Sequence, residues 1–164
     1  MSKRLVLLPL LLAAAAPALA APRGEAKLQI QGKNVTIDYG RPSLGGRDML
    51  GKADVGQTWR MGADAPTTLT TEADLTIGSA SVPKGSYVLT ATRKAKEEWT
   101  LNVEERGTAP GDAGKKVAEV PLTLATLPAS EEQLTINLTP NKYGGVFELK
   151  WGTAALRANI KAAK

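Results

Sequence analysis

The chain of 164 residues contains no histidine and no cysteine. This excludes a Ser-His-Asp triad, a cysteine nucleophile, histidine-ligated zinc and the usual ligands of haem and iron–sulfur clusters. No disulfide stabilises the fold. Acid–base chemistry near neutral pH would fall to a carboxylate, a lysine or a tyrosine. The composition therefore favours a role other than catalysis and predicts neither a metal nor a cofactor.

Long apolar runs are absent after the first residues of the chain. Lys3 and Arg4 precede an apolar run at residues 5–16, and small residues with the sequence Ala-Leu-Ala occupy positions 18–20. This order predicts a secretory signal peptide over residues 1–20, cleaved after Ala20, because the run is shorter than a membrane-spanning helix. We expect a periplasmic or secreted protein with no membrane span, in which residues 21–164 form a single domain.

Positive charge and aromatic side chains are both sparse. The formal net charge of +5 becomes +3 when the two basic residues of the predicted signal peptide are removed. The chain has one Phe, three Trp and three Tyr. Basic residues are spread along the sequence and form no run of four. The basic and stacking pattern of a nucleic-acid binder is missing, so no nucleic-acid partner is predicted.

Alternation of apolar and polar residues is the clearest signal in the sequence. It runs through residues 35–39, 99–104, 134–138, 147–151 and 156–160. A strand with one face in a core and the other in water has this period of two. Short turn-forming sequences separate many of these runs, at intervals typical of hairpins. The fold class predicted is all-β: an antiparallel β-sandwich, or barrel-like sandwich, of about eight to ten strands.

Three segments need separate interpretation. Residues 41–64 and 104–116 are the least strand-like, and we expect loops there. The alanine-rich C-terminal segment could be read as a helix, but its alternation favours a strand. We expect a turn at Gly152-Thr153, after which the last strand forms a closing hairpin with the one before it.

The loop 41–64 gathers side chains that do not look like plain scaffold. A guanidinium is suited to carboxylates, phosphates and sugar hydroxyls, and the face of a nearby tryptophan can stack on a ligand. The loop therefore predicts an anion or carbohydrate site. The candidate binding residues are Arg41, Ser43, Arg47, Asp48, Trp59, Arg60 and Asp64.

A structural interpretation competes with this binding hypothesis. Arg41 and Arg47 can pair with Asp48 or Asp64 and hold the loop on the sheet, while Trp59 anchors it in the core. Ser43 has no histidine to activate it as a nucleophile. No catalytic residue is assigned.

Several short motifs occur in a fixed order along the chain. They read YGRPS at 39–43, GR at 46–47, LG at 50–51, WRxGAD at 59–64, PxGxY at 83–87 and Trp at 99. In this order they resemble the exported bacterial family known as domain of unknown function 2911. The resemblance implies a small exported β-rich domain and assigns neither a reaction nor a ligand. Six of the candidate residues fall on motif positions: Arg41, Ser43, Arg47, Trp59, Arg60 and Asp64. Here Ala65-Pro66-Thr67 replaces the Glu-Ala-Thr that commonly follows.

Three functional hypotheses remain open from sequence. The first is an exported binding or accessory protein of the cell envelope, whose partner is an unknown small molecule or envelope component. The second is a hydrolase or lyase that acts on envelope or carbohydrate material with carboxylates alone, for which Asp48 and Asp64 are the only pair nominated. The third is a purely structural envelope protein that associates through its sheet edges.

Overall fold

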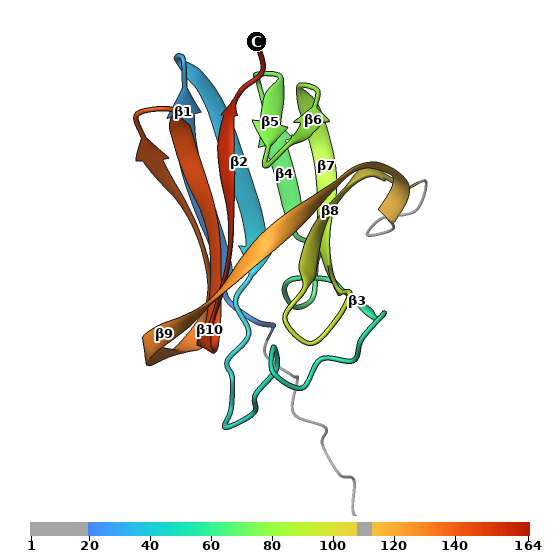
Figure 1. The fold of residues 1–164 in the computed structure, drawn as a ribbon, viewed down its shortest axis with the longest axis vertical. Helices are drawn as coiled ribbons and strands as arrows, with labels where there is room; N and C mark the ends of the chain where they lie inside the picture. Colours follow the sequence, from blue (N-terminus) through green and yellow to red (C-terminus); the bar gives the residue numbers. More distant parts are fainter. Residues whose placement is uncertain (1–19, 108–112) are drawn as a thin grey trace, which may run out of the picture.

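The computed structural model of the protein describes residues 20–107 and 113–164, and the regular elements there are all strands. The predicted signal peptide, apart from Ala20, lies outside the described residues. No helix in this part of the chain is long and apolar enough to cross a membrane. Figure 1 shows the strands in chain order: β1 (Arg23–Ile30), β2 (Lys33–Gly40), β3 (Thr58–Trp59), β4 (Thr68–Thr71), β5 (Leu75–Ile77), β6 (Ala80–Val82), β7 (Gly85–Arg93), β8 (Trp99–Arg106), β9 (Ala113–Asn141) and β10 (Gly144–Ala162).

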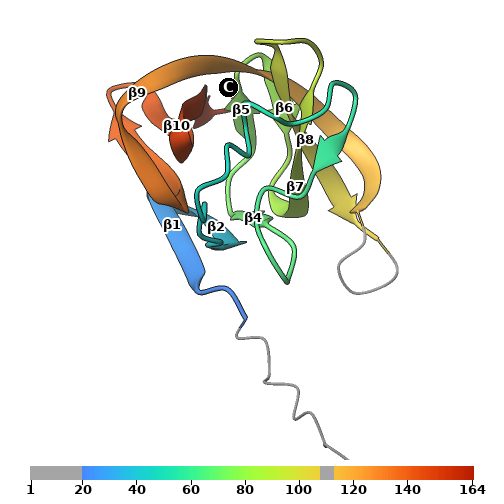
Figure 2. The ribbon, with the colours of Figure 1, turned by 90° about the horizontal axis from the view of Figure 1, so that it is seen from below.

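The strands form one antiparallel sheet that does not close on itself. Its order is β1-β2-β4-β7-β8-β9-β10-β5-β6, and β3 pairs with β7 beside this path. The sheet curves around the core, as the view from below shows (Figure 2), so that β1 packs against β9 and β10 without pairing to them. This arrangement confirms the predicted all-β sandwich and its number of strands.

Strand β9 connects the two halves of the sandwich. Its first part pairs with β8, and from Thr123 onward it pairs with β10. Figure 1 shows it crossing the molecule diagonally before the chain turns back as β10. The register between the two strands shifts on both sides of the pair Gly152–Glu131, and β9 carries extra residues between Thr126 and Thr135. A bulge of this kind bends a strand and lets it change sheets.

The alternation read from the sequence builds the core. Apolar positions of the predicted strands face inward and have at most 2% of their surface exposed: Val35, Ile37, Leu101, Val103, Leu134, Ile136, Phe147 and Leu149. Each such side chain contributes about 1.5–3 kcal/mol by leaving water. The core therefore rests on the period-two pattern, with no disulfide needed.

On the two central strands, β7 and β8, the polar residues of the alternating pattern are buried as well. Asn102 is 1% exposed, and its Nδ2 donates hydrogen bonds to Thr90 Oγ1 at 3.1 Å and Thr92 Oγ1 at 3.0 Å. The sequence predicted that such residues face water. Neighbouring strands flank β7 and β8 on both sides, so their small polar side chains are covered.

Two predictions of loops and turns are wrong in detail. No chain reversal occurs at Gly152, which has φ of +62° and lies inside the continuous strand β10. The segment 104–116 contains the end of β8, up to Arg106, and the start of β9 from Ala113, with residues 108–112 outside the described part. At Gly152 the strand bends, and β10 keeps pairing with β9 beyond it. In the second segment the strands extend further than predicted, because β8 and β9 pair as far as Arg106 and Ala113.

Candidate functional site

The loop from Arg41 to Gln57 lies at one end of the sandwich and is fixed first to β9. Ser43 forms an isolated β-bridge with Gln133, and the N–H of Leu44 donates to Glu132 O at 2.7 Å. Arg41 Nε donates to Leu134 O at 3.3 Å. These bonds align the start of the loop with a strand of the opposite half of the sandwich. The RPS sequence is thus held in place by main-chain pairing.

Arg93, at the end of β7, fixes the other end of the loop. Its Nη1 donates to the main-chain oxygens of Gly51 at 3.0 Å and Ala53 at 2.7 Å. Its Nε and Nη2 donate to Lys96 O at 3.1 and 2.6 Å. The planar fork of the guanidinium suits such divergent acceptors. One side chain therefore ties the loop to the turn between β7 and β8.

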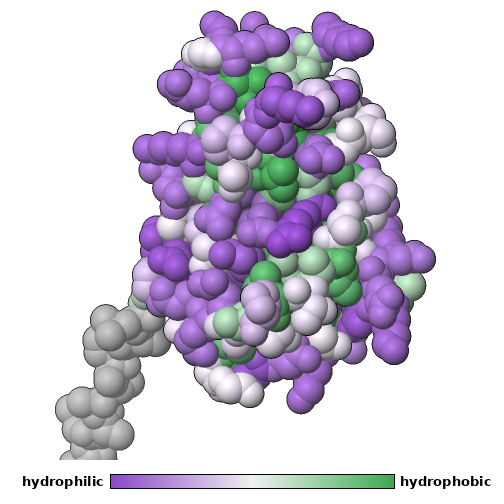
Figure 3. Space-filling view, turned by 60° about the vertical axis from the view of Figure 1, so that its left-hand side comes forward, coloured by the Kyte–Doolittle hydropathy of each residue, from purple (hydrophilic) through white to green (hydrophobic). Residues whose placement is uncertain are grey.

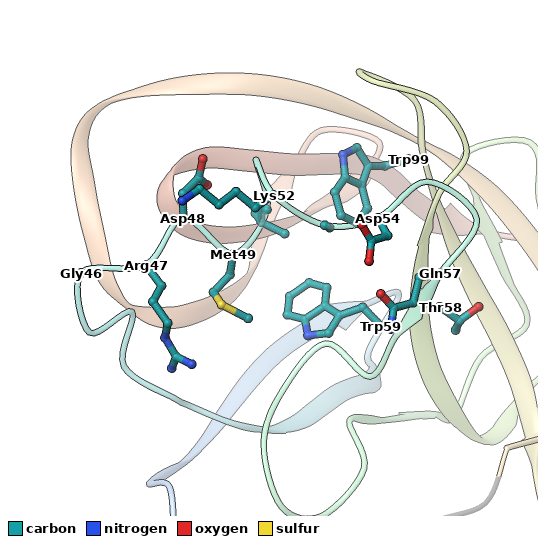
Figure 4. Close-up of a pocket in the computed structure, with 12 residues that line it drawn as sticks. Gly46, Arg47, Asp48, Met49, Lys52, Asp54, Gln57, Thr58, Trp59 and Trp99 are labelled. Carbon is teal, nitrogen blue, oxygen red and sulfur yellow. The ribbon is translucent and has the colours of Figure 1, made fainter.

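Between the loop and these strand ends lies a pocket of about 450 Å³. Its size falls within the range of sites for small ligands. Figure 4 shows Trp59 in the middle, with Met49 on one side, Gln57 on the other and Trp99 across from it. The lining residues are Gly46, Arg47, Asp48, Met49, Leu50, Lys52, Ala53, Asp54, Gln57, Thr58, Trp59 and Trp99. The walls are apolar and the rim carries charges of both signs.

The indole of Trp59 is held by a second tryptophan behind it. The rings of Trp59 and Trp151 are stacked, with centroids 5.7 Å apart and planes 11° apart. Trp151 is buried in β10, whereas Trp59 in β3 is half-buried. Across the pocket, the guanidinium of Arg93 lies 5.9 Å from the ring centroid of Trp99. The pocket therefore presents one partly exposed aromatic side chain on a rigid support.

The seven residues nominated from sequence separate into three groups. Arg47, Asp48 and Trp59 line the pocket. Arg41 and Ser43 contact β9, as described above, and are outside the lining. The remaining two, Arg60 and Asp64, form a separate turn. The structure thus brings three of the seven together.

The turn that follows Trp59 packs closely on the end of β2. Met61 is fully buried, and its main-chain oxygen accepts a hydrogen bond from Thr67 Oγ1 at 2.9 Å. Arg60 Nη2 donates to Asp64 O at 2.9 Å. A Cβ atom on Gly40 would lie 2.2 Å from Ala63 O, so only glycine permits this approach. The WRxGAD motif therefore forms a turn whose shape depends on its contact with Gly40.

The prediction from sequence did not include several residues that line the pocket. Met49, Lys52, Asp54 and Gln57 lie in the predicted loop but were not nominated. Their only sequence signal was proximity to Trp59, which does not specify side-chain direction. Trp99 occupies an apolar position of the alternating run 99–104; it is 3% exposed and also forms part of the pocket wall.

Three side chains elsewhere have shifted pKa values. The main-chain N–H of Asn34 donates to Glu72 and lowers the pKa of that carboxyl. Hydrogen bonds from Lys116 and Lys94 lower the pKa of Glu119, and burial raises the pKa of the Tyr87 phenol. None of these groups lines the pocket: Tyr87 and Glu119 lie in β7 and β9, and Glu72 directly follows β4. Within residues 20–107 and 113–164, no three acidic side chains gather as metal ligands.

The fold and this pocket define a small all-β protein with a loop-built site at one end of an open antiparallel sandwich. The family described as Protein of unknown function (DUF2911) matches residues 21–160, and the chain belongs to it. This confirms the resemblance carried by the motifs. No curated protein and no solved structure matches the chain.

Proposed function

We propose that the protein is exported and binds a carbohydrate, or a sugar-containing fragment of the cell envelope, in the pocket beside Trp59. The observation that carries this proposal is the half-buried indole of Trp59, backed by Trp151 and surrounded by a polar rim. A sugar ring has an apolar face that packs on an indole and hydroxyls that need donors and acceptors. Arg47 and Gln57 on the exposed rim supply both.

The mixed charge of the rim favours a sugar over a simple anion. Arg47 and Lys52 are accompanied by Asp48 and Asp54 in the lining. The two carboxylates would repel a phosphate or a small dicarboxylate, but they accept hydrogen bonds from sugar hydroxyls. The carboxylate of a sugar acid would also pair with Arg47 or Lys52. We therefore place neutral and uronic-acid oligosaccharides first among the ligands to test.

Substitution of Trp59 by alanine is expected to abolish binding, and Arg47→Ala is expected to weaken it about tenfold, equivalent to about 1.4 kcal/mol. The three tryptophans line the pocket or stack against its wall, so intrinsic fluorescence reports on the site. The measurement is a fluorescence titration with oligosaccharides, with thermal shift as a second readout. Lys142→Ala is the control, because Lys142 is exposed and lies outside this lining.

Equal binding by the Trp59→Ala and unsubstituted proteins would refute the site. The site is also refuted if neither fluorescence nor melting temperature responds to any neutral or acidic oligosaccharide. A response to inorganic phosphate alone would transfer the proposal to a simple anion. Because Arg47 is exposed, its substitution tests the site without disturbing the core.

A carboxylate-only hydrolase is the second candidate, favoured by two acids in one pocket. Asp48 and Asp54 both belong to the lining, whereas Asp64 does not. Asp48 Oδ1 accepts the N–H of Gly51 at 2.8 Å, so it also shapes the loop. Release of reducing ends from an envelope polysaccharide, lost in Asp54→Asn and retained in Asp64→Asn, would support hydrolysis. Binding without release would reject it.

The purely structural alternative has less support. The edge strands are β1, with eight residues, and β6, with three. On the face in Figure 3, hydrophilic residues surround small separate hydrophobic areas. Among the described residues, the exposed large hydrophobic side chains are Val55, Leu124 and Tyr143, which lie in different parts of the chain. These three side chains do not form a broad apolar surface for assembly.

A further inference from the structure

The chain enters the fold at Ala21. The main-chain nitrogen of Ala21 donates a hydrogen bond to Asp64 Oδ2 at 2.7 Å. The next residue, Pro22, accepts the N–H of Arg41 through its main-chain oxygen, also at 2.7 Å. Ala20 before them is exposed. The first anchored atom of the described chain is therefore the nitrogen of Ala21.

Asp64 is positioned to receive this nitrogen. Its backbone has φ of +60°, a left-handed conformation that Asp and Asn tolerate better than most residues. Its main-chain oxygen is held by Arg60 Nη2 at 2.9 Å. The carboxylate is directed at the incoming chain through the contact with Ala21. This gives Asp64 a local function that is independent of the pocket, whose lining does not include it.

The sequence independently predicts cleavage at the same place. Small residues at 18 and 20 precede the Ala20–Ala21 bond, the pattern that a leader peptidase recognises. Hydrolysis of this bond consumes a water molecule, leaves a carboxylate on Ala20 and an amine on Ala21, and the amine takes up a proton. We propose that Ala21 is the amino terminus of the mature protein and that Asp64 binds its ammonium group as a terminal clamp. This inference rests on export, which is part of the proposed function, but not on any ligand.

Cleavage would place a positive charge on the donor and so convert the hydrogen bond from a neutral N–H to the carboxylate into an ion pair. A peptide N–H donates to Asp64 before cleavage, and an ammonium group with three donors takes its place afterwards. The same surface also holds Arg23, which forms an ion pair with Asp38 and donates to Ala65 O at 3.2 Å. Arg60 donates to Asp64 O, so the new positive charge joins the two guanidinium groups of Arg23 and Arg60 on this turn. Asp64 is the acid in contact with the terminus that offsets them.

The absence of histidine and cysteine makes this clamp measurable. An α-amino group has an ordinary pKa of about 7.7–8.0, whereas carboxylates titrate near 4 and lysines near 10.4. In a chain with neither His nor Cys, the terminal amine is the group with an ordinary pKa near neutrality. A carboxylate in contact raises the amine pKa, so the stabilisation is present below about pH 7.7 and is lost as the pH rises through the raised value.

The test begins with the full-length chain, expressed in a bacterium and purified after export. Its mass is expected to match residues 21–164. A terminus at any other residue overturns the proposal. This readout requires no ligand, so failure of the carbohydrate pocket and failure of the clamp are distinguished.

The melting temperature is then compared between the mature protein and Asp64→Asn at pH 6.5 and pH 9.5. Asn keeps the acceptor and tolerates the left-handed backbone but removes the charge. We expect Asp64→Asn to lower the Tm by about 2–4 °C at pH 6.5 and by much less at pH 9.5. A difference that is the same at both pH values refutes the clamp.

A chain that begins at Ala20 is the matched control. It keeps the N–H of Ala21 as a neutral donor and moves the ammonium group one residue away. Its Tm at pH 6.5 is expected to fall close to that of Asp64→Asn. Introducing Asp64→Asn into this longer chain should lower the Tm little further. If the longer chain is as stable as the mature one at pH 6.5, Asp64 does not bind the terminal ammonium. This comparison decides the question even if Asp64→Asn does not fold.

Discussion

Substitution of Gly40 by alanine is expected to destabilise the protein by about 3 kcal/mol or more. The added Cβ would lie 2.2 Å from Ala63 O and 2.8 Å from Ala63 N, which are main-chain atoms that no rotamer change can move. Relief requires the whole turn after Trp59 to shift away from β2. Because small domains have only about 5–15 kcal/mol of stability, the loss is a large part of the total. Urea unfolding followed by tryptophan fluorescence measures it.

Gly45→Ala is the control for the backbone contribution alone. Gly45 has φ of +59°, and a Cβ there would meet no atom within 4 Å. Placing alanine in this left-handed conformation costs about 1 kcal/mol. If the two variants lose the same stability, close packing of the turn on β2 is not what requires Gly40.

Substitution of Arg93 by alanine is expected to cost about 2–3 kcal/mol and to loosen the pocket wall. The side chain donates to four main-chain oxygens, those of Gly51, Ala53, Ala95 and Lys96. Hydrogen bonds from charged donors are worth more than neutral ones, and loss of the guanidinium leaves these acceptors to water. Denaturant unfolding measures the stability. Hydrogen exchange across residues 48–58 measures the loosening.

Arg93→Lys separates charge from geometry. A lysine ammonium keeps the positive charge but cannot reach both the pair of oxygens in the loop and the pair in the turn between β7 and β8. We expect it to recover less than half of the stability lost in Arg93→Ala. Complete recovery would mean that charge near Trp99, rather than the bridge between the loop and the turn, is what matters.

The strands could be read from the sequence because burial imposes a simple period. Val35, Ile37 and Tyr39 alternate with polar residues, and the structure buries all three. The pattern failed at Gly152, where a glycine with positive φ bends a strand that continues to pair. A glycine in the sequence indicates only that the backbone can adopt unusual angles. Whether the chain reverses there depends on strand pairing with residues distant in sequence, such as Thr126 and Glu131 of β9.

The candidate site was less predictable, because its parts are joined by long-range contacts. Arg41 and Arg47 are six positions apart, yet one contacts β9 and the other lines the pocket. The stacking of Trp59 on Trp151 joins two residues that lie far apart in the sequence. Arg93 carried no motif, and its function depends on carbonyl groups that have no side-chain signature. Sequence located the loop correctly but could not assign its side chains to pocket or scaffold.

The diagonal course of β9 has a consequence for the order in which the protein is assembled. Strands β1 and β2, or β7 and β8, are neighbours in sequence and can pair as soon as they are synthesised. Strands β5 and β6 pair with each other locally, but they join the sheet only through the last residues of the chain, since Leu75 pairs with Ala162. Contacts of such high sequence separation slow folding. A nascent chain therefore cannot complete its sandwich until its final strand has been synthesised.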